Sequence, residues 1–575
     1  MNLKYVFTII NQSKMKKTIL TFLLLVFAVL CFSQNRKIKN VILFIPDGTS
    51  IDVLALTRWY NGNTPLALDN IICGMVKTHS SDGTIADSGP AGTAFATGEK
   101  AKSGYIGVSD SIIPLISVLE LTRLKGRSTG IVVTCDFLHA TPADFVCHYP
   151  DRKSYEILSE QFVFNSPSLV FSGGFKDINV IRSKEVLDTL AKRAIVVEDN
   201  LQAANYDIIK QGKSIWALFS DWKGDKQYMS HDIDKGSLEP SLADMTTKAI
   251  EILSQDKDGF FLMVEGSQVD WAAHNNDPVG VISDFMAFDR AVQVGLDFAW
   301  GEGDFKSNGH NGKGSTLIIV CPDHGTGGLS IGNKRSNLVK FQTDKTDRQY
   351  DSISYKEIID TLKLRWTAKK IAETIIRNPD TAYRHLINKN YDSLLISKSD
   401  STEIRKLANH KKEDKTDTLE HFLGRKFSDK HFIGWTTTGH TGEDVFLAVY
   451  HPDPARRLTG VVDNTRIANY IYEESIRKSC KKNDSLSGES KKYFNKIDTG
   501  SHSGRFSKIS LDTIGYTKLV FENGKDKIII PANRNYYLLN DKVIPLETLI
   551  VEINGAFYIS KALYNTLSIK KCGEE

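Results

Sequence analysis

The pattern of apolar and polar positions predicts buried strands that alternate with helices. Near-continuous apolar runs occur at residues 40–46, 130–135, 259–264 and 315–321, and helical patterns separate them. Strands that are apolar on both faces are typical of a parallel sheet covered by helices on its two sides. We therefore expect an α/β protein with a large, mostly parallel central sheet.

The C-terminal region changes character and predicts a small β-rich module at residues 506–575. Runs of alternating polarity, such as 527–531 and 549–553, lie between dipeptides that favour tight turns, and a short helical run follows at 560–567. The turn dipeptides are Asn523-Gly524, Asn540-Asp541 and Asn554-Gly555. The pattern loosely resembles stalk-like modules of secreted bacterial proteins, and a structural cap is the alternative.

Two other segments divide the rest of the chain. Residues 479–505 are polar and rich in small residues, which predicts a linker after a catalytic domain at 34–478. Residues 334–432 are charged and helical in pattern, which predicts a long insertion. The insertion either folds over the active-site cleft or forms the contact of a homodimer, and the sequence leaves both open.

The N-terminus predicts a secretory signal at residues 1–33. Lys16 and Lys17 precede an apolar run at 18–30, and small residues stand before the expected cleavage point. The run is too short to span a bilayer comfortably, so no transmembrane anchor is expected. Lipoprotein cleavage at Cys31 is an alternative, against which Leu30 argues. We expect an exported protein, periplasmic or extracellular.

Composition is that of an ordinary globular protein, with 41% hydrophobic and 25% charged residues in a chain of 575. This length exceeds a single hydrophobic core. The net charge is +4, and the signal segment carries lysines but no acids, so the mature chain is close to neutral and has no electrostatic case for nucleic acid. Of the scattered cysteines, Cys135 and Cys321 lie in apolar runs and are predicted to be buried thiols, and no disulfide pairing can be assigned.

Acidic residues stand where the predicted strands end. Asp47 follows the first strand, Glu265 the third and Asp323 the fourth, and Asp270 lies one helical turn before His274 on the helix after the third strand. One such acid is commonly a helix N-cap. Several at one sheet edge form a carboxylate cluster that cations must neutralise.

Histidines complete a set of candidate metal ligands. His274, His324 and His440, with neighbouring carboxylates, give the mixed nitrogen and oxygen coordination that suits zinc. Asp47, Glu265 and a hydroxyl would give an all-oxygen site that suits magnesium. A solvated helix start or a loop histidine is the alternative for each residue alone.

A nucleophile and an anion clamp are also present. Ser88, in Asp87-Ser88-Gly-Pro-Ala-Gly, begins a predicted helix, where the positive end of the dipole favours an alkoxide or phosphate oxygen, and small residues let the backbone approach a ligand. A plain N-cap is the alternative. The segment from His139 to Arg152 offers the Thr141 hydroxyl and a guanidinium that can hold two phosphoryl oxygens, or form an incidental surface ion pair.

Taken together and in order, these motifs resemble the alkaline phosphatase family over residues 38–478. The resemblance implies hydrolysis of small-molecule phosphate monoesters through a phosphoserine at Ser88, with Arg152 as the phosphate clamp. It implies two Zn²⁺ and one Mg²⁺. The implied ligands are Asp270, His274 and His440 for one zinc, Asp47, Ser88, Asp323 and His324 for the second, and Asp47, Thr141 and Glu265 for magnesium.

Two positions depart from the best-known bacterial pattern. His139 and Trp271 stand where that pattern has an aspartate and a lysine near the third metal and the phosphate. An imidazole in place of a carboxylate weakens the preference for magnesium. We expect both residues near the substrate phosphate and a changed response to added magnesium or cobalt.

Other activities of the same metal scaffold are the main alternatives. A sulfatase would need an arginine shortly after the nucleophile, which Ser88-Gly-Pro-Ala-Gly lacks. Phosphodiesterase relatives commonly have threonine as the nucleophile. A secreted binding protein with a structural metal would need neither Ser88 nor Arg152.

Overall fold

The structure is a computed structural model, and the predicted signal segment lies outside the residues it describes. So do parts of the predicted insertion and of the predicted linker, together with Cys480 and Cys572. The described residues are 38–174, 178, 181, 183–221, 223–224, 228–306, 312–332, 366–377, 398–409, 415–431, 433–477, 485–497, 508–512 and 516–567.

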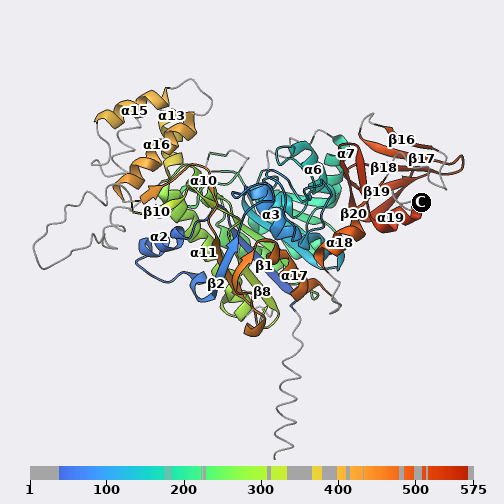
Figure 1. Cartoon of the computed structure of the whole chain (residues 1–575), viewed down its shortest axis with the longest axis horizontal. Coiled ribbons are helices and arrows are strands. Elements are labelled where there is room, and N and C mark those ends of the chain that lie inside the picture. The colour runs from blue at the N-terminus through green and yellow to red at the C-terminus, as the bar shows by residue number, and fades with distance from the viewer. Residues whose placement is uncertain are drawn as a thin grey trace, which may run out of the picture.

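A ten-stranded sheet forms the centre of the molecule (Figure 1), in the order β14-β2-β13-β8-β1-β7-β3-β4-β6-β5. Every neighbouring pair is parallel except those of β13, which runs antiparallel to β2 and β8. The predicted α/β class is confirmed. The strands are β1 (Asn40–Pro46), β2 (Ile72–Lys77), β3 (Ser128–Asp136), β4 (Leu169–Gly173), β5 (Ala194–Glu198), β6 (Ser214–Leu218), β7 (Phe260–Gly266), β8 (Thr316–Val320), β13 (Val445–Tyr450) and β14 (Gly460–Asp463).

Helices cover both faces of this sheet because its strands are apolar on both sides. In β1, Val41 and Leu43 pack into one hydrophobic core, and Ile42 and Phe44 pack into the other. The first core contains residues of α3 (Ser88–Thr97), α4 (Val118–Leu124), α5 (Ala140–Asp144), α6 (Tyr155–Phe164), α7 (Lys184–Arg193) and α17 (Thr465–Ile471). The second contains residues of α2 (Asp52–Tyr60), α8 (Tyr206–Lys210), α9 (Leu242–Leu253), α10 (Gln268–His274) and α11 (Pro278–Trp300).

The described part of the predicted insertion is helical, as expected. It comprises α13 (Ala368–Arg377), α15 (Lys398–Ala408) and α16 (Lys415–Lys430), which share a small core of their own at one end of the molecule (Figure 1). The backbone N–H groups of Thr367 and Ala368 donate to Asp234 and Asp277 of the main domain. These bonds fix the start of α13 beside α11.

The C-terminal region is a second, antiparallel sheet that carries the short helix α19 (Lys561–Leu567), in the order β15-β21-β20-β19-β18-β17-β16. The β-rich class predicted for this region is confirmed. Asn540, Asp541 and Asn554 adopt positive φ at the predicted turns. The strands are β15 (Asn495–Lys496), β16 (Lys508–Asp512), β17 (Lys518–Glu522), β18 (Lys527–Pro531), β19 (Arg534–Leu539), β20 (Lys542–Ile553) and β21 (Ala556–Ile559).

The segment predicted as a linker, 479–505, is more ordered than its composition indicates. It contains α18 (Leu486–Tyr493) and the strand β15. Leu486 and Phe494 are buried in the main core, and Ser485 caps the helix by accepting from the Gly488 N–H at 3.1 Å. Polar contacts also dock this helix, since Ser490 accepts from the Ile116 N–H at 3.1 Å and Glu489 accepts from the Tyr472 hydroxyl at 3.2 Å.

A buried arginine joins the C-terminal sheet to the main domain. Arg534 of β19 donates to Glu160 of α6 at 3.0 Å and to Glu185 of α7 at 3.3 Å, and its guanidinium carbon lies 4.7 Å from the centre of the Phe164 ring. Its side chain is 1% exposed. Figure 1 shows β19 and β20 beside these helices.

The remaining short strands and helical turns connect these layers. They are β9 (Gly325–Thr326), β10 (Leu329–Ile331), β11 (Ile433–Trp435) and β12 (His440–Thr441), with single turns at Ala67–Ile71, Leu201–Ala203, Asp232–Asp234, Gly303–Lys306, Pro454–Arg456 and Tyr472–Ile476. Among the described residues, we find no helix with the length and apolar character needed to cross a bilayer.

Candidate metal centre and active site

The candidate ligands gather at the carboxyl ends of neighbouring strands. β8, β1, β7 and β3 lie side by side in the sheet. Asp47 follows β1, Asp323 follows β8, and Glu265 is the penultimate residue of β7. Parallel strands deliver their carboxyl ends to one edge, where α/β proteins bind ligands. The acids that the sequence places at strand ends therefore meet in one site.

Asp270, His274 and His440 form one ligand cluster, with ligand atoms within 4.8 Å of one another. His274 Nε2 lies 3.3 Å from Asp270 Oδ2, one turn apart on α10. His274 Nδ1 donates to the Thr438 carbonyl at 2.5 Å, so Nε2 is the nitrogen that would bind a metal ion after losing its proton. Thr326 Oγ1 donates to Asp270 Oδ1 at 2.6 Å.

Asp47, Asp323 and His324 form a second cluster, fully buried. His324 Nε2 lies 3.2 Å from Asp323 Oδ2 and 3.7 Å from Asp47 Oδ1. Both Asp47 carboxylate oxygens and Asp323 Oδ2 have no hydrogen-bond partner. Buried carboxylate oxygens without donors are costly unless a cation neutralises them, so this donor set fits a zinc ion.

A short strand pair brings the two clusters together across the insertion. β12 pairs antiparallel with β9, so His440 lies opposite Thr326. The His324 and His440 ring centres are 4.1 Å apart as a result. Gly48 also permits this closeness, because a Cβ at that position, where φ is +63°, would lie 2.4 Å from Asp270 Oδ1.

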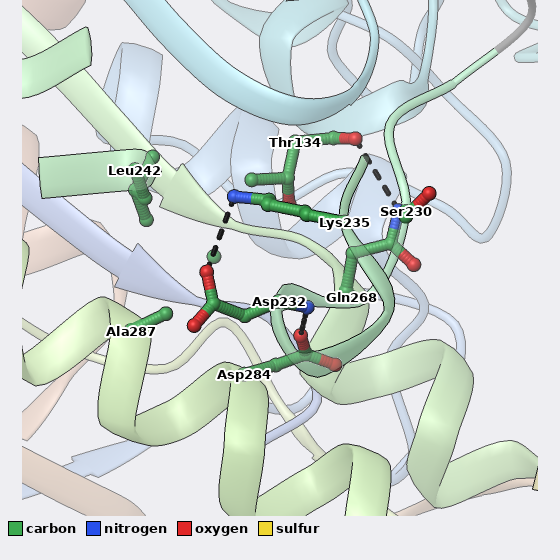
Figure 2. Close-up of a pocket in the computed structure, with 9 residues that line it drawn as sticks. Thr134, Ser230, Asp232, Lys235, Leu242, Gln268, Asp284 and Ala287 are labelled. Carbon is green, nitrogen blue, oxygen red and sulfur yellow. Dashed lines mark hydrogen bonds and ion pairs between the residues drawn. The ribbon is translucent and has the colours of Figure 1, made fainter. Parts of the chain in front are cut away.

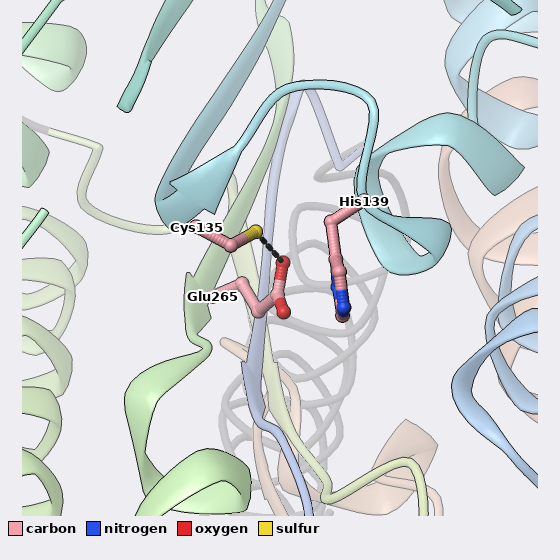
Figure 3. A group of neighbouring side chains, drawn as sticks. All are labelled: Cys135, His139 and Glu265. Carbon is pink, nitrogen blue, oxygen red and sulfur yellow. Dashed lines mark hydrogen bonds between the residues drawn. The ribbon is translucent and has the colours of Figure 1, made fainter. Parts of the chain in front are cut away.

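Glu265 belongs to a third cluster of candidate ligand atoms, with Cys135 and His139, and lies close to Asp47. Glu265 Oε1 and Thr141 Oγ1 are buried without hydrogen-bond partners. Glu265 and Thr141, with Asp47, are the magnesium ligands that the family resemblance implies, and their unpartnered oxygens fit a divalent cation. Cys135 and His139 offer ligand atoms to the same space (Figure 3).

Ser88 is the first residue of α3 and faces the second cluster. Its Oγ lies 3.3 Å from His324 Nε2. Asp87 occupies the N-cap position, but its carboxylate makes no capping bond, so the plain N-cap interpretation is wrong for this residue. The small residues after Ser88 serve protein packing rather than ligand approach: a Cβ on Gly89 would lie 2.9 Å from the Tyr105 carbonyl, and one on Gly92 would lie 2.3 Å from Asp144.

Arg152 is held beside Ser88 rather than at the surface. Its Nη1 donates to Asp87 Oδ2 at 2.7 Å, and its Nη2 lies 3.3 Å from His139 Nε2. Its backbone N–H donates to the Gly104 carbonyl at 2.9 Å. Because Asp87 is the residue before Ser88, one aspartate sets the position of the guanidinium relative to the hydroxyl.

Trp271 lies among aromatic rings next to this arginine. Its ring centre is 5.8 Å from that of His139 and 5.0 Å from that of Tyr228. Lys369 of α13 places its Nζ 4.4 Å from the Tyr228 ring centre and 5.7 Å from that of Trp271. A residue of the insertion thus reaches the ring packed against His139.

Electrostatics of the site reflect crowded carboxylates. Burial, with Asp323 nearby, raises the pKa of Glu265 to about 8, and burial with three neighbouring acids raises that of Asp47. Burial alone would raise the pKa of Asp270, but His274 and the other histidines hold it below its ordinary value. Asp270 in turn overcomes burial and raises the pKa of His274 to about 9.

Two other histidines of the site have lowered pKa values and are neutral. Burial, reinforced by Arg152, lowers the pKa of His139 to about 3, and burial, reinforced by His324, lowers that of His440 to about 3. A neutral imidazole carries a free lone pair. Both side chains can therefore act as metal ligands or hydrogen-bond acceptors at any physiological pH.

A polar pocket lies beside the start of α10, the helix that carries Asp270 and His274 (Figure 2). Gln268 Nε2 donates to the carbonyls of Met229 at 2.8 Å and Thr134 at 3.3 Å. Nearby, the Asp232 N–H donates to Asp284 at 2.6 Å. The two hydrogen bonds of Gln268 thus connect the start of α10 to β3 and to the segment before α9.

Four groups that position or adjoin the candidate ligands were not identified as such from the sequence. Thr326 and the Thr438 carbonyl orient ligands, and each stands two residues from a predicted ligand, which was the available signal. Asp87 was considered only as a cap. Cys135 was predicted as a buried thiol, which it is, but its nearness to Glu265 follows from the pairing of β3 with β7.

Comparisons with known proteins agree on one family. The family model for alkaline phosphatase matches residues 38–178 and 197–475. Alkaline phosphatase 3 of Bacillus subtilis (strain 168) is 31% identical over 471 residues, covering 78% of this chain and 92% of the relative. Alkaline phosphatase 4 of the same strain is 32% identical over 456 residues, covering 76% and 89%.

A solved structure gives the same result. The chain is similar to the cold-active alkaline phosphatase from the psychrophile Shewanella sp., with a TM-score of 0.61 and 27% identity, over 76% of this chain and 100% of that one. The family match ends at residue 475, so the C-terminal sheet from 508 onward lies beyond it.

Proposed function

The chain belongs to the alkaline phosphatase family and is a metal-dependent phosphatase of phosphate monoesters, and on that premise we propose that Ser88 is its nucleophile and forms a phosphoserine. The observation that carries this proposal is the position of Ser88 Oγ, 3.3 Å from His324 Nε2 at the edge of the second ligand cluster. A serine at a helix start beside buried ligand atoms is suited to lose its proton and attack phosphorus.

The residues fit two zinc ions and a third divalent ion. Asp270, His274 and His440 would hold the first, and the second cluster with Ser88 the other. Asp47, Thr141 and Glu265 would supply oxygens to the third ion, for which the family resemblance implies magnesium. Divalent ions bound there would lower the pKa of the serine hydroxyl and neutralise charge on the phosphoryl group.

The protein's own groups orient the substrate. Arg152, held by Asp87, would use N–H donors of its guanidinium to bind the phosphoryl oxygens of an ester attacked by Ser88. His139 and Trp271 border the same position. Because all these contacts address the phosphoryl group, the alcohol portion of the ester is left unspecified, and we propose a broad range of monoester substrates.

Replacing Ser88 by alanine tests the proposal. Hydrolysis of an aryl phosphate by metal-loaded Ser88→Ala should fall by at least about a thousandfold, since the covalent route is lost. Ser159→Ala is the control, because Ser159 is also buried on one of the helices but bonds only to the Glu156 carbonyl at 2.8 Å. Undiminished turnover in Ser88→Ala would rule out the proposed nucleophile.

A panel of esters separates the remaining alternatives. We expect a monoester to be turned over far faster than a diester or a sulfate ester, because Arg152 and the clusters match a phosphoryl group with free oxygens. A preference for the diester would instead identify a phosphodiesterase of the same scaffold. Family membership already excludes the interpretation as a non-catalytic binding protein.

We further propose export and a modular chain. The signal-like segment 1–33 would be removed, a catalytic domain would extend over 34–478, and residues 506–575 would form a separate β-rich module. N-terminal sequencing of protein recovered outside the cytoplasm should begin shortly after residue 33. Intact Met1 or Met15 in that fraction would contradict removal of the segment.

A further inference from the structure

A buried thiol belongs to the third cluster and has no role in the function proposed so far. Cys135, in β3, places its Sγ 3.8 Å from Glu265 Oε2. Figure 3 shows both side chains and His139 converging on one space. The ligand atoms of these three residues all lie within 4.8 Å of one another, as those of the other two clusters do.

The surroundings show that this space is built for a cation. Glu265 is fully buried, and its Oε1 has no hydrogen-bond partner. His139 Nδ1, in the same cluster, and Thr141 Oγ1, two residues further along the chain, also have none. A buried carboxylate oxygen without a donor destabilises the protein by the cost of its desolvation, unless a positive ion occupies the space it faces.

We propose that the third site binds zinc in preference to magnesium, with Cys135 as a thiolate ligand beside His139 and Glu265. Magnesium requires oxygen ligands, whereas sulfur and imidazole nitrogen select zinc. As the metal–sulfur bond forms, the Cys135 thiol releases its proton to solvent. The assignment rests on the proposed function for the two neighbouring zinc sites, but it concerns a different ion.

Occupation of this site also affects the phosphate clamp. His139 is neutral and has a single lone pair, which now accepts from Arg152 Nη2 at 3.3 Å. If the metal binds His139 Nε2, that lone pair is no longer available to Arg152. If the metal binds Nδ1, the proton moves to Nε2, and two donors then face each other. Either way the ion displaces Arg152 from His139 and leaves Asp87 as its partner.

Cobalt substitution tests the assignment without relying on turnover. Metal-free protein is titrated with Co²⁺ while bound metal is counted and the thiolate-to-cobalt charge-transfer absorption is recorded. The wild type should bind three ions and show this band. Cys135→Ala and Cys135→Ser should lack it and bind the third ion at least about tenfold more weakly. Cys147→Ala is the control, since that buried thiol donates to the Leu158 carbonyl at 3.4 Å and belongs to none of the three clusters.

Two results would overturn the proposal. One is a wild-type protein that binds three cobalt ions but does not show the band. This result does not depend on the folding of any variant. The other is an unchanged band in Cys135→Ala. If either result is found and turnover still depends on Ser88, only the assignment of Cys135 is rejected. If the wild type shows the band but Ser88→Ala keeps its turnover, only the proposed function is rejected.

Discussion

At the scale of single residues, the site depends on side chains whose roles are set by one neighbour each. Asp87 both precedes Ser88 in the chain and holds Arg152 through a bond of 2.7 Å. Thr326 and the Thr438 carbonyl hydrogen-bond to Asp270 and His274, which are proposed metal ligands. Such partners fix geometry that the ligands alone would leave free.

Arg152→Lys should lower kcat/KM for an aryl phosphate by about 10- to 100-fold, because an ammonium cannot reproduce the two-donor fork that the guanidinium presents. Inhibition by inorganic phosphate should weaken in parallel. Arg58→Lys is the matched control, since Arg58 on α2 also pairs with one aspartate, Asp69, away from the three clusters. Equal effects of the two replacements would contradict the clamp assignment.

The residue scale also shows where sequence reasoning stops. Asp270 and His274 could be singled out because their spacing on one helix is local information, and Ser88 because it begins a helix among small residues. The contact of Cys135 with Glu265 depends on which strands pair and in what register, and that of Lys369 with Trp271 depends on how the insertion docks. Neither is encoded in a short motif.

At the scale of elements, four central strands of the sheet, β1, β3, β7 and β8, were predicted from the sequence, whereas the other six strands and the connections were not. Apolar runs that end in acids identify strands directly, and β1, β7 and β8 lie within a residue or two of the predicted ranges. His440 reaches the site only because β12 pairs with β9 across the whole insertion. The helix α18 was missed, because Leu486 and Phe494 are too sparse to create a helical pattern.

The helix α10 acts as the rigid support of the first ligand cluster, and Gln268 anchors it. Gln268→Ala should weaken zinc binding at that cluster by up to about tenfold, since the helix start loses its bonds to Met229 and Thr134. Competition with a chromophoric chelator measures this affinity. Gln293→Ala is the control, because Gln293 bonds only within its own helix, to Asp297. Identical zinc affinity in both variants would show that α10 needs no such anchor.

At the scale of the whole molecule, the C-terminal sheet is joined to the catalytic domain by a buried charge. Arg534→Ala should lower the free energy of unfolding by about 3 kcal/mol, because Glu160 and Glu185 lose their shared partner. Arg466→Ala is the control: its pair with Glu473 is about one-third exposed and should be worth under about 1 kcal/mol. Denaturant unfolding compares them, and equal losses would refute a structural role for Arg534.

The carboxylate cluster should also make stability depend on pH when metal is absent. The pKa values of Glu265 and His274 are raised to about 8 and about 9, so each binds a proton more tightly in the folded protein than in the unfolded chain. Their stabilising contributions are full below the unfolded pKa and are lost as pH rises through these values. Metal-free protein should therefore lose thermal stability between pH 7 and pH 9.

Metal-loaded protein should behave in the opposite way over the same range. Metal ligands must be deprotonated, so higher pH favours the bound ion and the folded state with it. The difference in Tm between loaded and chelated protein should consequently widen from pH 7 to pH 9. A constant difference would mean that the carboxylates and His274 do not titrate as the crowded site requires.

The most direct test of the central claim is to locate the phosphoryl group on the enzyme. Metal-loaded protein turning over a phosphate monoester is quenched in acid, digested and mapped by mass spectrometry. We predict phosphate on Ser88 and on no other residue, and its loss in Ser88→Ala. Hydrolysis that proceeds with no phosphorylated peptide, or with phosphate on a different side chain, would contradict the account.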